Sequence, residues 1–176
     1  MNKVLALLGA LVLAVIAYTA LSPQSANEEA ATVDVATVGS AVEPTMGFID
    51  DERIKNAASE PGNWLSFGRT YEEQRHSPLT QINKETVGQL GLAWYKDMNT
   101  NRAQEATPIV VDDTMFFSST WSKVFAVDAI TGETKWSYDP EVPGEWARKA
   151  CCDVVNRGVA VYKGRVYVGT LDGRLG

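Results

Sequence analysis

The sequence predicts an all-β fold, the N-terminal portion of a β-propeller preceded by a short helix and a tether. Short runs of β-branched and aromatic residues alternate with turn residues between positions 109 and 138. The first half of this pattern returns about 50 residues later. Repeats of this length with four short strands are typical of propeller blades. A β-sandwich is the alternative, but it does not require an in-register repeat.

Residues 1–26 have the layout of an export signal. Lys3 precedes an uncharged apolar run from Val4 to Leu21, and small and polar residues follow at Ser22–Ala26. The apolar run is also just long enough for a membrane-spanning helix. We therefore expect either a cleaved signal peptide or a retained N-terminal membrane anchor. Both alternatives predict an exported, periplasmic protein.

The formal net charge of −6 is concentrated in residues 27–61, which predict an acidic tether followed by a short helix. The helix is expected over Asp50–Ser59, with Asp50 or Asp51 as its cap and Pro61 beyond its end. Its apolar side would consist of Ile54, Ala57 and Ala58. Residues 62–176 are nearly neutral and show no basic patch, which argues against binding to nucleic acid.

Residues 62–176 predict the first blades of a truncated propeller. The expected strands of the first blade are Ile109–Val111, Met115–Ser119, Val124–Val127 and Lys135–Tyr138. A second copy with strands at Val159–Val161 and Arg165–Thr170 follows at an offset of 50, which aligns Val111 with Val161 and Thr120 with Thr170. At most about two blades fit into this segment, whereas stacked repeats typically need at least three for stability.

A turn-and-tryptophan motif lies at the end of the first blade. It consists of Ala126, Asp128, Thr131, Gly132 and Trp136. The Asp and Thr side chains can hydrogen-bond the turn backbone, the glycine permits positive φ, and the tryptophan offers a flat surface for a neighbouring blade. Trp94 is the candidate equivalent of Trp136 in a preceding, partly formed blade.

Cys151 and Cys152 are adjacent. In an exported protein a bond between them is chemically plausible, although Cα atoms about 3.8 Å apart lie below the usual disulfide span of about 4.4–6.8 Å. The ring formed would be strained, and strain is most often found at functional sites. Two reduced, buried cysteines are the alternative. A zinc site is weakly supported because adjacent cysteines lack the usual ligand spacing.

From about Pro61 to its end the sequence resembles the pyrroloquinoline quinone (PQQ) dependent alcohol dehydrogenases. Ala126–Trp136 matches the tryptophan-docking motif of these quinoproteins in full, and the resemblance extends over Trp64–Arg69, Gln74–Leu79 and Gly144–Leu175. The sequence of Asn101–Pro108 most resembles that of the quinohaemoprotein alcohol dehydrogenases, which carry a C-terminal cytochrome c domain. The sequence contains no Cys-x-x-Cys-His motif, so haem c would belong to a later segment.

The resemblance implies an eight-bladed periplasmic enzyme that oxidises alcohols to aldehydes with PQQ and passes electrons to a cytochrome c. It implies that Cys151 and Cys152 form a vicinal disulfide against one face of the quinone. It further implies that Arg157 pairs with a cofactor carboxylate and that Glu105 hydrogen-bonds the cofactor. A non-enzymatic propeller, such as an assembly scaffold, is the alternative.

The family also uses a calcium or lanthanide ion, which polarises a quinone carbonyl, and an aspartate as general base. Nothing in residues 1–176 resembles these groups, so no catalytic residue and no metal ligand is assigned, and the chain by itself is expected to be inactive. Asp153 suits a loop hydrogen bond better than catalysis. The lone His76 is expected to be a packed or surface residue rather than a ligand.

Overall fold

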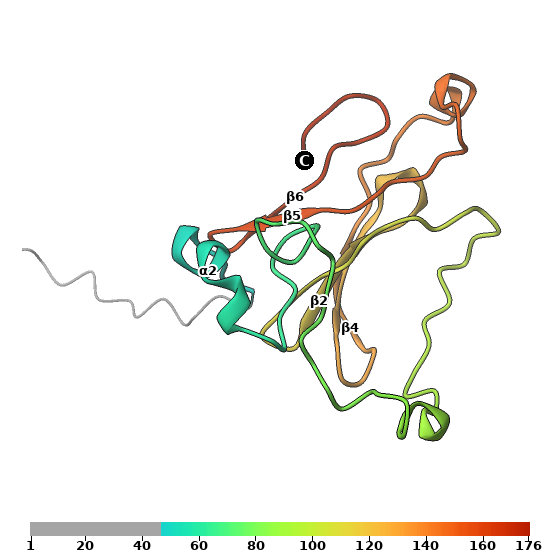
Figure 1. Cartoon of the computed structure of the whole chain (residues 1–176). Coiled ribbons are helices and arrows are strands. Elements are labelled where there is room, and N and C mark those ends of the chain that lie inside the picture. Colours follow the sequence, from blue (N-terminus) through green and yellow to red (C-terminus); the bar gives the residue numbers. More distant parts are fainter. Residues whose placement is uncertain (1–46) are drawn as a thin grey trace, which may run out of the picture. The chain divides into compact units, whose positions relative to one another are not determined.

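The computed structural model describes residues 47–176 (Figure 1). The predicted leader at 1–26 and the tether up to residue 46 lie outside this range. The described range contains helix α2 (Asp51–Lys55), a four-stranded sheet and a two-stranded sheet. No helix in this range is long and apolar enough to cross a membrane. The strands are β1 (Ile109–Val111), β2 (Thr114–Ser118), β3 (Val124–Asp128), β4 (Thr134–Tyr138), β5 (Ala160–Tyr162) and β6 (Arg165–Tyr167).

The first sheet is the predicted four-stranded meander. Its strands are antiparallel and lie in the order β1-β2-β3-β4. Strand β2 alternates as its sequence predicts, because successive side chains of a strand point to opposite faces. Thr114, Phe116 and Ser118 are buried, whereas Met115 and Phe117 are half-buried. The sheet thus has one face in the core and a second face that the loop before β1 only partly covers.

The two hairpins share one turn geometry, at an offset that differs from the prediction. Each turn has two residues with positive φ, Asp112 and Asp113 at 49° and 57° and Lys163 and Gly164 at 47° and 72°. Such turns match the twist of the flanking strands. Val111 pairs with Thr114 and Tyr162 with Arg165, so the hairpins correspond at an offset of 51. The predicted alignment of Val111 with Val161 at 50 is therefore wrong by one residue.

The helical segment is shorter than predicted. Asp50 caps α2, because its carboxylate accepts a hydrogen bond of 2.9 Å from the Arg53 backbone N–H. The helix ends at Lys55, and a separate 3₁₀ turn follows at Ala57–Ser59. The tighter 3₁₀ turn rotates side chains differently from an α-helix. Consequently Ala57 is buried and Ala58 is exposed, which corrects the prediction that they share one side.

The core lies where α2, the first sheet and the second hairpin meet. Its buried members come from the segments that flank α2, from the first sheet and from the second hairpin: Ile49, Ala57, Leu65, Ile109, Val111, Phe116, Ala126 and Val161. The β5–β6 turn lies beside α2 (Figure 1), where the Lys163 backbone N–H donates to the Ile49 carbonyl at 2.7 Å. The predicted second copy therefore packs against the first through a shared apolar core.

Arg53 joins α2 to the first hairpin. Its guanidinium binds the Glu60 carboxylate at 2.6 Å and the Asp112 carboxylate at 2.9 Å. It also donates to the Phe48 carbonyl at 2.6 Å. The hydrogen bond from Arg53 lowers the pKa of the Glu60 carboxyl below its ordinary value of 4.5. Helix and hairpin are thus linked by a partly buried ion-pair cluster.

The Glu60 carboxyl gives a pH prediction. Because its pKa is lower in the folded state, its contribution to stability is complete above pH 4.5 and is lost as the pH falls through the folded-state pKa. We expect Glu60→Gln to reduce stability by about 1 kcal/mol near neutral pH and to flatten its decline on acidification. Thermal unfolding between pH 7 and pH 3 measures this. Glu52→Gln, which removes the exposed pair with Lys55, serves as control. Parallel curves for wild type and Glu60→Gln would contradict the prediction.

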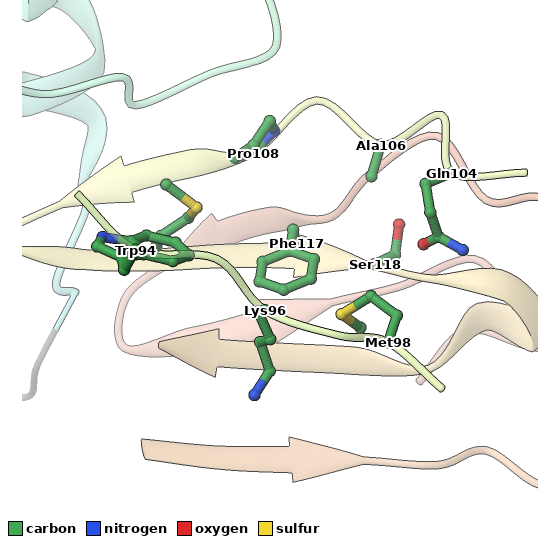
Figure 2. A pocket seen from close by; sticks show the side chains of 9 residues that line it. Trp94, Lys96, Met98, Gln104, Ala106, Pro108, Phe117 and Ser118 are labelled. Atoms are coloured by element: carbon green, nitrogen blue, oxygen red, sulfur yellow. The ribbon is translucent and has the colours of Figure 1, made fainter. Parts of the chain in front are cut away.

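Trp94 lies on the turn of the first blade, as expected of a docking tryptophan from a preceding blade. Its indole N–H donates to the Ala129 carbonyl at 3.1 Å. A Cβ atom on Gly132 would lie 2.6 Å from the indole ring, so the ring rests directly on that glycine. Figure 2 shows the segment that carries Trp94 crossing the half-buried face of β2. Between them remains a groove of about 270 Å³ with a mainly apolar lining.

Candidate functional site

Two loops that run side by side hold the predicted site residues. The first loop precedes β1 and carries Glu105, whereas the second follows the 3₁₀ turn Gly144–Lys149 and precedes β5. The Thr107 backbone N–H donates to the Arg157 carbonyl at 3.1 Å, and Thr107 forms a parallel bridge with Gly158. Gly158 has a φ of +139°, and a Cβ atom there would lie 3.0 Å from the Thr107 carbonyl oxygen. The glycine therefore allows the close approach of the two loops.

Cys151 and Cys152 form a vicinal disulfide. Their Cα atoms are 3.8 Å apart, and both residues are exposed. This exposure does not agree with the alternative in which both cysteines are buried. Asp153 follows directly with a φ of +75°, a conformation that few residues other than glycine adopt. The chain thus turns sharply after the disulfide and leaves both sulfur atoms accessible to a ligand.

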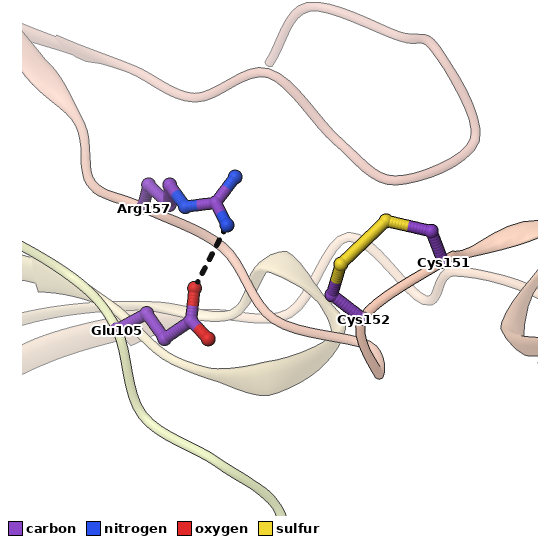
Figure 3. The surroundings of a disulfide bond; sticks show 4 residues. All are labelled: Glu105, Cys151, Cys152 and Arg157. Atoms are coloured by element: carbon purple, nitrogen blue, oxygen red, sulfur yellow. Dashed lines mark ion pairs between the residues drawn. A yellow bond between two sulfur atoms is a disulfide. The ribbon is translucent and has the colours of Figure 1, made fainter.

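Glu105 and Arg157 form an ion pair beside this disulfide. The Arg157 Nη2 and Glu105 Oε2 atoms are 3.1 Å apart, and the two side chains are 70% and 37% exposed. Figure 3 shows the two side chains pointing toward one another, with the disulfide next to them. The four residues predicted as a site are thus brought together. Because the guanidinium is mostly exposed, most of its donors remain accessible to a carboxylate ligand.

Asn156 fixes the backbone next to Arg157. Its side-chain amide donates to Ser122 Oγ at 3.2 Å and to the Gly169 carbonyl at 2.8 Å, while its oxygen accepts from the Gly158 N–H at 3.1 Å. Val154 is fully buried, and its carbonyl accepts from the Trp121 N–H at 2.9 Å. The exposed residues of the candidate site therefore lie on a backbone that buried contacts hold in place. Neither Asn156 nor Ser122 was predicted from the sequence as part of the site.

Asp153 makes loop contacts, as the sequence indicated. Hydrogen bonds from the Val154 backbone, and then the Arg102 charge and the Ala103 backbone, lower the pKa of its carboxyl below the ordinary value of 3.8. Arg102 Nη1 lies 2.8 Å from Asp153 Oδ1. His76 is exposed. Within residues 47–176, no group of three or more His, Cys, Asp or Glu side chains is arranged to hold a metal ion.

The turn-and-tryptophan motif has the geometry that its residues predict. Asp128 Oδ1 accepts from the backbone N–H groups of Ile130 and Thr131 at 3.0 and 2.9 Å, and Gly132 has a φ of +77°. Ala126 is fully buried. Trp136 lines a groove of about 320 Å³ together with Tyr138, Val166 and Val168. Its ring thus faces the side of the sheet on which the second hairpin lies.

Four features define the class of protein as a quinoprotein-type β-propeller. They are the four-stranded meander, the repeat of its first hairpin, the docking-type tryptophan turn and the vicinal disulfide on the intervening loop. A family model described as "PQQ: Glucose/ethanol/alcohol dehydrogenase, beta-propeller domain" matches residues 64–176. The chain belongs to this family.

Relatives with known names agree with this assignment. The dehydrogenase subunit of alcohol dehydrogenase (quinone) from Komagataeibacter europaeus is 56% identical over 137 residues, which covers 74% of this chain and 18% of that protein. The solved structure of quinohemoprotein alcohol dehydrogenase ADHIIG from Pseudomonas putida HK5 is similar with a TM-score of 0.72 and 56% identity, over 74% of this chain and 19% of that one. A europium-containing methanol dehydrogenase has a TM-score of 0.65 and 36% identity, over 71% and 22%. The chain therefore spans about a fifth of the length of these relatives.

Proposed function

We propose that this chain forms one wall of the PQQ site in a periplasmic alcohol dehydrogenase. The observation that carries the proposal is the exposed Glu105–Arg157 ion pair beside the exposed vicinal disulfide. A charged pair on an open surface is available to a ligand, and here it stands next to a rigid, apolar sulfur surface. Membership of the PQQ family supplies the cofactor class that suits both features.

The chemistry of these residues fits PQQ, which is a flat tricarboxylate. Arg157 offers a planar guanidinium that suits bidentate binding of a carboxylate. Glu105 supplies an acceptor or, when protonated, a donor for a polar group of the ring, and the disulfide offers a surface against one ring face. When bound, PQQ accepts the two electrons and the hydrogen removed from the alcohol carbon. The residues of this chain would bind and orient the quinone.

We propose that the remaining parts of the enzyme lie in other segments of the complete protein. These parts are the calcium or lanthanide ion with its ligands, the general base and the alcohol pocket. The names of the similar structures, a europium-containing dehydrogenase and a quinohemoprotein, support a metal ion and a haem. The name of a similar enzyme from Thauera butanivorans, 1-butanol dehydrogenase (cytochrome c), supports electron transfer to a cytochrome c. An N-terminal signal or anchor at residues 1–26 would direct the protein to the periplasm. Residues 62–176 would supply the first blades of the propeller.

A non-enzymatic scaffold is the second candidate that the docking motif allows. A scaffold needs the tryptophan turn for blade packing, but it has no need of a vicinal disulfide beside an exposed ion pair. The two functions therefore differ in one measurable property, which is binding of PQQ to the complete protein.

The proposed function is tested with the complete protein purified without cofactor and then titrated with PQQ and calcium. We expect saturable PQQ binding, alcohol-dependent reduction of an artificial electron acceptor, and at least a tenfold lower activity in Cys151→Ser/Cys152→Ser. Peptide mapping without reductant should show a two-hydrogen mass deficit in the wild-type peptide that contains both cysteines.

The control for the serine variant is its far-ultraviolet circular dichroism and melting temperature, which should remain near those of wild type because both cysteines are exposed. Two freely labelled thiols in native wild type, or no PQQ binding by the folded protein, would refute the proposed enzyme and favour the scaffold.

A further inference from the structure

Arg102, three residues before Glu105, is not among the residues proposed to contact the cofactor. Its guanidinium Nη1 lies 2.8 Å from Asp153 Oδ1, across 51 positions of sequence. The Arg102 side chain is 50% exposed and that of Asp153 is 27% exposed. An isolated pair with this exposure contributes little to global stability. Its importance must therefore be sought in what it holds in place locally.

The pair is the first of three links that join the two loops in parallel. In this link the Arg102 guanidinium donates to the Asp153 carboxylate at 2.8 Å. The second link is the Glu105–Arg157 ion pair, and the third is the bridge between Thr107 and Gly158. Asp153 directly follows the disulfide, so the first link is the one nearest to the sulfur atoms.

Asp153 also carries local backbone strain. Its φ of +75° is unfavourable in a residue other than glycine and persists only where the surroundings enforce it. The ion pair with Arg102, whose Nη1 donates to Asp153 Oδ1 at 2.8 Å, is a contact that can enforce it. Without this contact the residue directly after the disulfide can relax, and the sulfur atoms can move with it.

From this geometry we propose that Arg102 and Asp153 are positioning residues. Their ion pair fixes the vicinal disulfide relative to Glu105 and Arg157, so that the ring surface and the charged pair meet one flat ligand together. The part of the proposal that concerns PQQ rests on the proposed function. The part that concerns the disulfide does not, because reactivity of the disulfide can be measured without cofactor.

The test uses the complete protein without PQQ and follows reduction of the disulfide by dithiothreitol through labelling of the thiols formed. We expect Arg102→Ala and Asp153→Asn each to increase the reduction rate about fivefold, and the double variant to be no faster than the faster single variant. Arg102→Lys, which keeps the charge, should stay within about twofold of wild type. Arg148→Ala is the matched control, because Arg148 is an exposed arginine near Cys151 without an ion pair among the described residues.

A parallel titration with PQQ should show an affinity about fivefold lower in Arg102→Ala and unchanged in Arg148→Ala, with equal melting temperatures. Additive rate increases in the double variant, or equal effects of Arg102→Ala and Arg148→Ala, would overturn the proposal. Unchanged PQQ affinity in Arg102→Ala would overturn it as well. If wild type binds no PQQ, the proposed function fails, whereas the order of the reduction rates still decides whether the ion pair positions the disulfide.

Discussion

Replacement of Arg157 by alanine should weaken binding of PQQ to the complete protein by about 100- to 1000-fold. In the proposed complex a cofactor carboxylate leaves water and is held by the guanidinium. Removing one partner of such a pair leaves the other charge unpaired and costs about 3–4 kcal/mol, because about 1.4 kcal/mol corresponds to a tenfold change in affinity. Arg157→Lys should retain part of the affinity, because an ammonium group keeps the charge and loses the planar bidentate geometry.

The dissociation constant for PQQ, measured by titration of the cofactor-free protein, tests this expectation. Arg165→Ala is a suitable control, because Arg165 is an exposed cation on β6 outside the candidate site. Its removal lowers the net positive charge equally without removing the proposed carboxylate partner. A loss smaller than tenfold in Arg157→Ala, or an equal loss in Arg165→Ala, would show that Arg157 does not bind the cofactor.

Gly132→Ala should destabilise the first blade strongly, by about 2–6 kcal/mol. Two effects add at this position. A residue other than glycine with a φ of +77° is strained by about 1–3 kcal/mol. The added Cβ atom would also lie 2.6 Å from the Trp94 ring, and overpacking of this kind costs typically 1–3 kcal/mol. The ring cannot retreat without losing its hydrogen bond to the Ala129 carbonyl.

Gly173→Ala separates the two effects. Gly173 has a φ of +87°, and a Cβ atom there would meet nothing within 4 Å. Urea unfolding followed by tryptophan fluorescence should therefore show the backbone strain alone in Gly173→Ala and the larger loss in Gly132→Ala. In a Trp94→Ala background the additional loss at Gly132 should disappear. Equal effects of the two glycine substitutions would contradict a docking role for Trp94.

Most of the fold could be predicted from local patterns in the sequence. The strands of the meander were predictable because β-branched and aromatic runs alternate with turn residues, and hydrogen bonds between adjacent strands need only short connections. The Asp50 cap and the Asp128 turn were predictable for the same reason, since each depends on contacts within three residues. The two loops that carry the site were predicted because their sequences resemble those of a known family.

Contacts that span about 50 residues were decided only by the tertiary structure. The sequence suggested a shared role for Glu105 and Arg157, yet their ion pair, and that of Arg102 with Asp153, exist because parallel packing brings two irregular loops together. Neither loop has a period from which such a register could be derived. The hairpin turns set the offset between the two repeats at 51 residues instead of the predicted 50. The end of the predicted helix at Lys55 was likewise decided by the tertiary structure. The sequence thus determined the elements and the chemical groups, and packing determined which groups meet.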